Sequence, residues 1–265
     1  MYKKFYEFCR RNVHISTCWY FLKEIKNLIL YHQIEPRQYI VSKEKKVIYL
    51  RNPKVANSSI KTSLYSGEAK DDYSIHSIVV NTGMQKVKLS AEELDYFKFT
   101  YVRNPFERLV SCYESKYHAD KIKYKDKDKL LYFDSYLLGY IRKDKGFDNF
   151  IKRIIRLPYW CMDRHFFPQY YWTHDERGQQ LLDYIGQYEN LEEDFKKIQE
   201  KYGLKPLPHY NSSGGEKRDW RSYYTLETAK LVYEKYKKDI ECFGYEDSYK
   251  DLIAYLKTEK TNNHG

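Results

Sequence analysis

Apolar residues recur at strand and helix spacings along most of the chain, and their order predicts an α/β fold. The runs 46–50 and 96–102 are short and rich in β-branched and aromatic residues, so they predict two strands. Each run leads into a polar turn and then a helical stripe, which begins near residue 58 after the first and at Pro105 after the second. Asn104 is a natural N-cap for the second helix. This repetition favours a central parallel sheet flanked by helices, with a ligand at the carboxyl ends of its strands.

The rest of the pattern extends this unit to one large domain. We expect a helix near 147–155, a strand at 181–186, a helix that ends near Gly203 and a closing amphipathic helix at 225–243. The charged segment 119–130 and the stretch around residues 207–220 have the composition of loops. The resulting division is an N-terminal helical extension (1–45), a domain (46–250) and a C-terminal tail (251–265), whose last residues, 258–265, are expected to be frayed.

Residues 1 to about 44 are expected to be helical, with an apolar stripe that contains Phe21, Ile25 and Ile29. Such a stripe usually packs on a core, and contact with a membrane surface is the alternative because lysines lie nearby. No segment approaches the roughly 20 apolar residues of a membrane span, and no signal-peptide pattern occurs. Five cysteines without metal-type spacing favour a reducing compartment. We therefore expect a cytoplasmic protein.

The charge balance narrows the kinds of partner. Lys and Arg outnumber Asp and Glu by 47 to 37, which gives a formal net charge of +10. These residues are spread along the chain, so they favour anionic ligands such as an acidic polysaccharide, a phosphorylated cofactor or nucleic acid. Solvated helix faces are the alternative for most of the lysines. A nucleic-acid-binding module would require a recognised fold motif or a concentrated basic stripe, and neither occurs.

The first turn, within RNPKVANSSIKTSL (residues 51–64), has the composition of an anion site without glycine. A helix N-terminus offers unpaired backbone N–H groups and a partial positive charge. The small or hydroxylated residues from Ala56 to Ser59 would let an oxyanion approach the backbone, and Lys54 adds a mobile charge. A Walker A loop would place its lysine late, as GK[ST], so a kinase that uses ATP and magnesium is the disfavoured alternative. A plain serine-capped turn is the other alternative.

The second turn, in YVRNPFERLVSCY, places Arg103 at a strand end and Ser111 within the following helix. A guanidinium donates two parallel bonds to a phosphate, and a hydroxyl can add a third. Alternatively, Arg103 and Arg108 pair with Glu107 or Glu114 on the surface. Two anion-binding turns in one chain indicate a ligand that is phosphorylated at two places.

Together PKVANSSIK and FKFTYVRNPFERLVSCY resemble the carbohydrate-type sulfotransferases that use 3′-phosphoadenosine 5′-phosphosulfate (PAPS), the family of the chondroitin and heparan sulfate enzymes. The resemblance runs from about residue 46 to 245 and includes DRHFFPQ, DYIGQYENLEEDF and LPHYNSS. It implies a P-loop-like nucleotide-binding fold and transfer of a sulfuryl group to a carbohydrate hydroxyl. Eukaryotic Golgi members carry a membrane anchor, which this chain lacks, so we expect a bacterial cytoplasmic enzyme.

The resemblance also implies roles for individual residues. The loop that binds the 5′-phosphosulfate would consist of Lys54, Val55, Ala56, Asn57, Ser58 and Ser59. Arg103 and Ser111 would bind the 3′-phosphate, and Lys217 and Arg218 lie in a segment similar to the one that closes over the donor. PAPS is then the co-substrate, no metal is required, and nucleic acid is not a partner. The oligomeric state stays open.

Sulfuryl transfer resembles phosphoryl transfer in that positioning and charge stabilisation supply most of the catalysis. Lys54 would neutralise charge on the bridging oxygen, and a general base must take the proton of the acceptor hydroxyl. Histidine titrates in the useful range. His76, between the two turns, is the first candidate, and His165 in DRHFFPQ is the rival.

Recognition of the acceptor is the least defined part of the site. Carbohydrate sites combine aromatic faces with a few polar groups. The sequence offers Tyr159, Trp160, Tyr170, Tyr171 and Trp172 as faces, and Arg153, Arg156 and Arg164 as partners for an acidic sugar. Each of these aromatic residues can equally be part of the core. No residue identifies the sugar or the hydroxyl.

Overall fold

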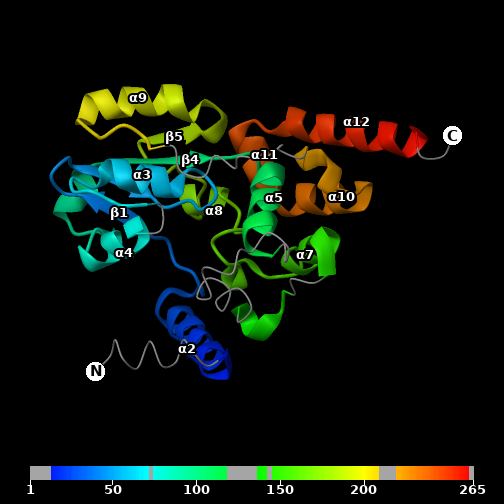
Figure 1. Cartoon of the computed structure of the whole chain (residues 1–265), viewed down its shortest axis with the longest axis horizontal. Helices are drawn as coiled ribbons and strands as arrows, with labels where there is room; N and C mark the ends of the chain where they lie inside the picture. Colours follow the sequence, from blue (N-terminus) through cyan, green and yellow to red (C-terminus); the bar gives the residue numbers. More distant parts are fainter. Residues whose placement is uncertain (1–12, 72–73, 118–135, 142–144, 209–218, 263–265) are drawn as a thin grey trace. The chain divides into compact units, whose positions relative to one another are not determined.

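The computed structural model of the chain describes residues 13–71, 74–117, 136–141, 145–208 and 219–262. It divides into two compact units. The first consists of Met1–Pro36, Pro105–Phe167 and Arg218–Gly265, and the second of Arg37–Asn104 and Pro168–Lys217. The second unit contains a β-sheet, whereas the described residues of the first are helices and connecting segments (Figure 1).

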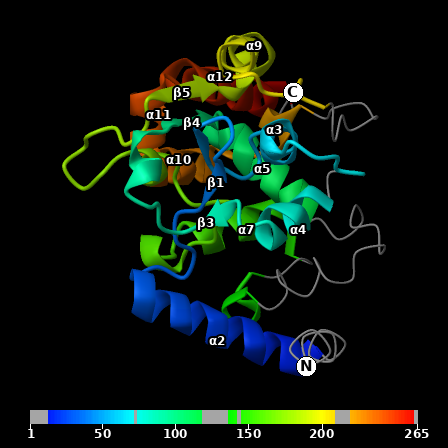
Figure 2. The ribbon, with the colours of Figure 1, turned by 90° about the vertical axis from the view of Figure 1, so that its left-hand side faces the viewer.

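The second unit is built on a five-stranded mixed sheet in the order β3-β1-β2-β4-β5 (Figure 2). The strands are β1 (Tyr39–Ser42), β2 (Val47–Leu50), β3 (Gln85–Lys86), β4 (Phe97–Val102) and β5 (Tyr184–Gln187). β2, β4 and β5 run parallel, and β1 is antiparallel to both β2 and β3. The α/β prediction is confirmed, and β1, next to the edge strand β3, is the strand that runs opposite to the other four.

Three helices of this unit bury their apolar faces in one cluster with the sheet. They are α3 (Asn57–Leu64), α4 (Ser74–Asn81) and α9 (Leu191–Tyr202), and the shorter elements are η1 (Glu92–Asp95), α8 (Tyr170–Thr173) and η7 (Tyr188–Asn190). Because side chains alternate across a strand, Tyr49 and Phe99, which are paired in register, both enter this cluster, whereas Ile48 lies in a second cluster with Val41. The three helices therefore cover one face of the sheet.

A glycine allows the close packing of β4 and β5. Gly186 pairs with Tyr101, and a Cβ at Gly186 would lie 2.4 Å from Cε1 of the Tyr101 ring. The ring is fully buried against Phe195 of α9. Any side chain at residue 186 would displace this ring, so Gly186 is required where the chain passes from the sheet to the turn after β5.

The first unit packs helices around a largely aromatic core. Its elements are α2 (Val13–Tyr31), α5 (Pro105–Lys116), η4 (Tyr136–Gly139), α7 (Gly146–Ile154), η6 (Tyr159–Cys161), η8 (Trp220–Tyr223), α10 (Leu226–Lys235), α11 (Lys237–Phe243) and α12 (Glu246–Asn262). Phe106 of α5 stacks near Tyr249, and Tyr113 contacts Phe147. Tyrosine thus supplies buried area that a core with more Leu and Val would obtain from aliphatic residues.

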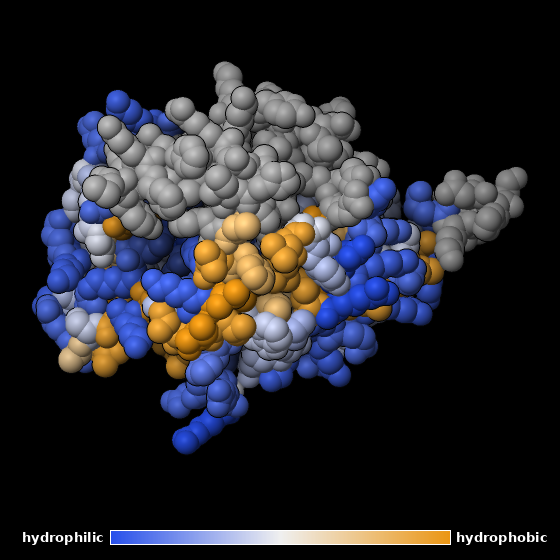
Figure 3. Space-filling model, turned by 90° about the horizontal axis from the view of Figure 1, so that it is seen from below, coloured by the Kyte–Doolittle hydropathy of each residue, from blue (hydrophilic) through white to orange (hydrophobic). Residues whose placement is uncertain are grey.

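Helix α2 presents an apolar face to solvent among the residues that the structure describes. Leu22, Ile29 and Leu30 are more than half exposed, and Phe21 and Ile25 are partly exposed. Apolar side chains gather on the face of the molecule seen in Figure 3. None of the described helices is both long enough and apolar enough to cross a membrane.

Most of the expected elements form close to the predicted residues. Pro105 begins α5, and α9 ends at Gly203, which adopts the left-handed conformation with φ 62°. Three expectations are wrong. The N-terminal helix does not reach residue 44, because Tyr39–Ser42 is a strand of the sheet. The closing helix is two helices, α10 and α11, which are separated at Tyr236.

The third error concerns the C-terminus. Residues up to Asn262 continue α12, so most of the expected frayed tail is helical. The division into extension, domain and tail stays a prediction. Segment 119–130 lies outside the described residues, as does most of the expected loop at 207–220.

Candidate active site

The loop at residues 54–59, called the phosphate loop here, follows β2 at the carboxyl edge of the sheet. Lys54 and Ala56 adopt left-handed backbone conformations, with φ of 72° and 45°. Residues other than glycine rarely do so, and the cost is on the order of 1–3 kcal/mol for each residue. Strain of this kind clusters at ligand-binding sites, so the loop without glycine still has the backbone shape that glycine would provide.

The phosphate loop leads directly into α3. Ala56 occupies the N-cap position and has no side-chain oxygen that could accept bonds from the N–H groups of the first turn. These N–H groups belong to Asn57, Ser58 and Ser59, and the helix dipole favours an anion beside them. Val55 is fully buried in the hydrophobic cluster. Val55 can therefore contact a ligand only through its backbone.

Arg103 follows β4 and lies beside the phosphate loop. Its Nη1 donates to the carbonyl oxygen of Lys54 at 3.4 Å, and its guanidinium lies 4.6 Å from the centre of the Tyr188 ring, just after β5. Asn104 donates its backbone N–H to Oε1 of Glu189 at 3.1 Å. The turns after three parallel strands therefore meet, which is where open α/β sheets bind ligands.

Gln169 connects two of these turns and is fully buried. Its Oε1 accepts from the backbone N–H of Arg103 at 3.0 Å, and its Nε2 donates to the Arg103 carbonyl at 2.8 Å. Oε1 also accepts from Nδ2 of Asn52 at 3.0 Å, and Nδ2 donates to the Tyr101 carbonyl as well. Gln169 thus holds the backbone at the ends of β2 and β4 in one arrangement.

His76, on α4, reaches α3 at the phosphate loop. Its Nε2 lies 3.2 Å from Oγ of Ser58, and its Nδ1 lies 3.1 Å from Nζ of Lys61. Lys61 is fully buried. Burial lowers the pKa of the Lys61 amine well below its usual value, and the charge of Arg51 lowers this pKa further. The structure therefore brings His76 together with the predicted residue Ser58, and it adds Lys61, to which the sequence assigned no role.

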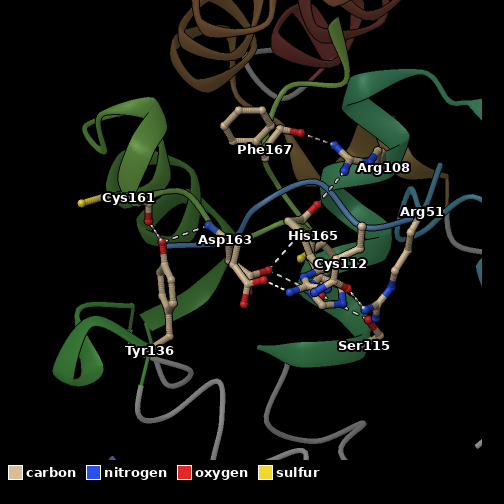
Figure 4. Close-up of polar contacts among 12 residues, drawn as sticks. Arg51, Arg108, Cys112, Ser115, Tyr136, Cys161, Asp163, His165 and Phe167 are labelled. Carbon is tan, nitrogen blue, oxygen red and sulfur yellow. Dashed lines mark hydrogen bonds and ion pairs between the residues drawn. The ribbon is translucent and has the colours of Figure 1, made fainter. Parts of the chain in front are cut away.

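His165 belongs to the first unit and has a different partner. Its Nδ1 lies 2.6 Å from Oδ1 of Asp163, which also accepts from the backbone N–H of His165 at 2.8 Å (Figure 4). Asp163 is fully buried, and its own N–H donates to the hydroxyl of Tyr136 at 3.0 Å. A carboxylate at Nδ1 favours the tautomer with its proton on Nδ1 and a lone pair on Nε2, as in serine hydrolases.

The remaining predicted donor-binding residues are placed as follows. Ser111 is half-buried on α5, in the same unit as His165. Lys217 and Arg218 lie outside the described residues.

Arg108 is not a surface residue, because it is almost fully buried and donates to the carbonyls of Phe167 and Arg164 at 2.8 and 2.9 Å (Figure 4). Within the described ranges, His, Cys, Asp and Glu form no group of three that could hold a metal ion.

The candidates for acceptor recognition differ in exposure. Tyr159 and Trp160 are exposed, whereas Trp172 is buried and belongs to the interior. Arg164 is buried in an ion pair with Glu35, so the proposed role in reading an acidic sugar is wrong for this residue. Tyr170, Tyr171 and Arg153 are half-buried, and Arg156 is exposed.

Sequence reasoning missed two residues of this site. Gln169 closes the motif DRHFFPQ, in which only the histidine received a role, and Lys61 closes PKVANSSIK. Each lies within a quoted motif, and that position was the only signal. Their partners are distant in the chain, so only the folded structure identifies them.

Comparisons with known proteins agree with this geometry. The chain is 27% identical over 233 residues to carbohydrate sulfotransferase 14 of Danio rerio, which covers 78% of this chain and 61% of that protein. It is 33% identical over 110 residues to an uncharacterised protein of Archaeoglobus fulgidus, covering 41% of this chain and 69% of that one. No solved structure matches significantly. A model described as a sulfotransferase family matches residues 37–246, so the chain belongs to the sulfotransferase family.

Proposed function

We propose that this protein transfers a sulfuryl group from PAPS to a hydroxyl of a carbohydrate by in-line displacement. The observation that carries the proposal is the phosphate loop, whose left-handed residues Lys54 and Ala56 lie beside Arg103 at the carboxyl edge of the sheet. Membership of the sulfotransferase family implies this sulfate donor.

The residues of the phosphate loop fit the anionic end of such a donor. The uncapped first turn of α3 would hold the 5′-phosphosulfate through backbone N–H groups and the hydroxyls of Ser58 and Ser59. Lys54 would neutralise charge as the bond between sulfur and the bridging oxygen breaks. Arg103 would bind the 3′-phosphate, with the guanidinium held against Tyr188. The assignments of Ser111, Lys217 and Arg218 rest on the resemblance alone.

A base must remove the proton of the acceptor hydroxyl, and two histidines are candidates. His76 is supported by its contact with Ser58 in the phosphate loop. His165 is supported by its contact with the buried carboxylate of Asp163. The two proposals predict different variants to be inactive, so they can be separated by experiment.

A carbohydrate acceptor is supported by the relative from Danio rerio, whose name states that class of substrate. The exposed rings of Tyr159 and Trp160 and the exposed side chain of Arg156 suit an acidic sugar chain. The chain spans 61% of the length of that relative, so the acceptor belongs to the proposal rather than to the family assignment.

Thermal unfolding with nucleotide tests the donor. We expect 3′-phosphoadenosine 5′-phosphate at about 100 times its Kd to stabilise the protein by roughly 2.7 kcal/mol, and ATP with Mg²⁺ to do much less. Lys54→Ala should weaken this shift and abolish turnover, whereas Lys196→Ala, at an exposed lysine of α9, should leave both unchanged. Equal shifts from the two nucleotides would favour a kinase, and no shift from the bisphosphate would refute the donor assignment.

A further inference from the structure

Three polar side chains form a continuous chain of contacts that begins at the phosphate loop. Ser58 Oγ lies 3.2 Å from His76 Nε2, and His76 Nδ1 lies 3.1 Å from Lys61 Nζ. Ser58 and Lys61 are on α3 and His76 is on α4, two helices that pack together in the second unit (Figure 2). The chain of contacts therefore leads from the expected anion site into the hydrophobic cluster behind it.

Lys61 ends this chain in surroundings that disfavour a positive charge. Its side chain is fully buried, and the adjacent Ile60 and the nearby Leu64 belong to the hydrophobic cluster. No carboxylate among the described residues forms an ion pair with it. An ammonium group without a counter-ion is costly in an apolar interior, so the neutral amine is the favoured form.

The ionisable groups that the described part of the chain places around the amine are positive or neutral. Arg51, which follows β2, acts on Lys61 as a like charge and disfavours the ammonium form further. α4 contributes His76, and β2, which packs against α3, contributes Tyr49 of the same hydrophobic cluster. Lys54 of the phosphate loop is a further positive charge of the same segment.

The charge of Lys61 limits the tautomers that the ring of His76 can adopt. A neutral amine has a lone pair and can accept from Nδ1–H, which leaves the lone pair of Nε2 directed at Ser58. An ammonium group has only donors, so it would donate to Nδ1 and place the ring proton on Nε2. Only the first arrangement leaves Nε2 able to accept a proton at the phosphate loop.

We propose that Lys61 is a positioning residue whose neutral amine accepts a hydrogen bond from Nδ1–H of His76. This hydrogen bond keeps the lone pair on Nε2, which can then act as the general base. This inference rests on the proposed function. As the acceptor oxygen bonds to sulfur and the bond to the bridging oxygen breaks, the hydroxyl proton moves to Nε2. The imidazolium that forms is stabilised through Nδ1–H by the Lys61 amine, and the proton is released to water after the product leaves.

Nitrogen NMR of protein labelled at histidine tests the tautomer without any substrate. The sequence has eight histidines, so the His76 signals are assigned from their loss in His76→Asn. Near pH 7.5 we expect a protonated Nδ1 and a bare Nε2 in the native protein, and loss of this preference in Lys61→Met. A native Nε2–H tautomer, a native imidazolium or an unchanged tautomer in Lys61→Met would refute the proposal, whatever reaction the protein catalyses.

Turnover measurements separate positioning from a purely structural role. Lys61→Met should lower kcat about 100-fold and shift the acidic limb of its pH profile, with the KM for the donor unchanged. Lys61→Arg replaces the neutral amine with a permanently charged group that can only donate, so it should not support normal turnover. Lys196→Met is the matched control. Normal kcat in Lys61→Arg, or an unshifted profile in a folded Lys61→Met protein, would refute the role of Lys61.

Discussion

His76 and His165 are both half-buried histidines in motifs of the same family, yet their surroundings are opposite. His76 contacts the buried amine of Lys61 and the hydroxyl of Ser58. His165 contacts the fully buried carboxylate of Asp163 through both its ring and its backbone. A carboxylate stabilises an imidazolium ring by its negative charge. A neutral amine can stabilise the ring only by accepting a hydrogen bond from one of its N–H groups.

This difference shows that a histidine motif alone does not define a base. His165 also has a structural role. The buried carboxylate of Asp163 requires hydrogen-bond donors, and His165 supplies two of them. The ring of His76 lies at the expected anion site. We therefore take His76 as the base and His165 as the alternative.

The largest expected effect comes from removing each histidine in turn. His76→Asn should lower kcat by 10²- to 10⁴-fold, the usual contribution of a general base, and leave binding of 3′-phosphoadenosine 5′-phosphate intact. His165→Asn should retain more turnover but unfold at a lower temperature, because Asp163 loses a donor. Steady-state kinetics and calorimetry check both variants. Near-normal turnover in His76→Asn, with inactivity in a folded His165→Asn, would reverse the assignment.

A smaller effect is expected at Gln169, which lies in the same unit as His76 and holds the backbone of Arg103. In Gln169→Leu the backbone N–H and carbonyl of Arg103 lose their partner in a buried place. We expect the KM for the donor to rise about 10-fold, together with a loss of stability of roughly 1–3 kcal/mol. Gln179→Leu, at an exposed position of the same unit, is the control. An unchanged KM in Gln169→Leu would mean that Gln169 does not position the site.

The smallest effect concerns Glu24, a buried residue of α2. Its carboxyl group interacts electrostatically with Asp163, the partner of His165. Burial raises the pKa of Glu24 from 4.5 to about 7, and the charge of Asp163 adds to the rise. Because the folded pKa is above the unfolded one, the folded state binds more protons, and its stability is lost as the pH rises from 4.5 to about 7.

Glu24→Gln should remove this dependence. At pH 8 the melting temperature of the variant should exceed that of the native protein by a few degrees, and at pH 4.5 the two should be equal. A chain of this size gains about 2–4 °C per kcal/mol of stability. Thermal unfolding at several pH values measures the difference. Equal gains at both pH values would show that Glu24 is not protonated in the folded state.

Much of the fold was predictable because strands, turns and helices are local features of the pattern. The strand at 97–102, the start of α5 at Pro105 and the end of α9 at Gly203 follow from alternation, a fixed φ and a left-handed C-cap. The strand Tyr39–Ser42 was missed because only four residues separate it from the next strand, and an apolar stripe at helical spacing precedes it. Pairing with β2 and β3 stabilises this segment as a strand.

The candidate site was predictable in part for the same reason. Lys54, Ser58 and Arg103 stand next to turns, where backbone groups become available to a ligand, so their motifs indicated an anion. The loss of Arg164 from the acceptor candidates came from its pairing with Glu35, a residue far away in the chain. Burial of a charged side chain depends on such distant partners, and a motif does not contain them.

The sequence by itself determined that two anion-binding turns follow two strands, and that these turns resemble those of a sulfotransferase. Both conclusions depend on neighbouring residues, since a strand, its turn and the next helix are read within about 15 residues. Only the tertiary structure decided that Gln169 joins the two turns and that Lys61 lies behind His76. Burial and hydrogen-bond partners arise when distant segments pack together, and the same packing sets the protonation of a buried amine.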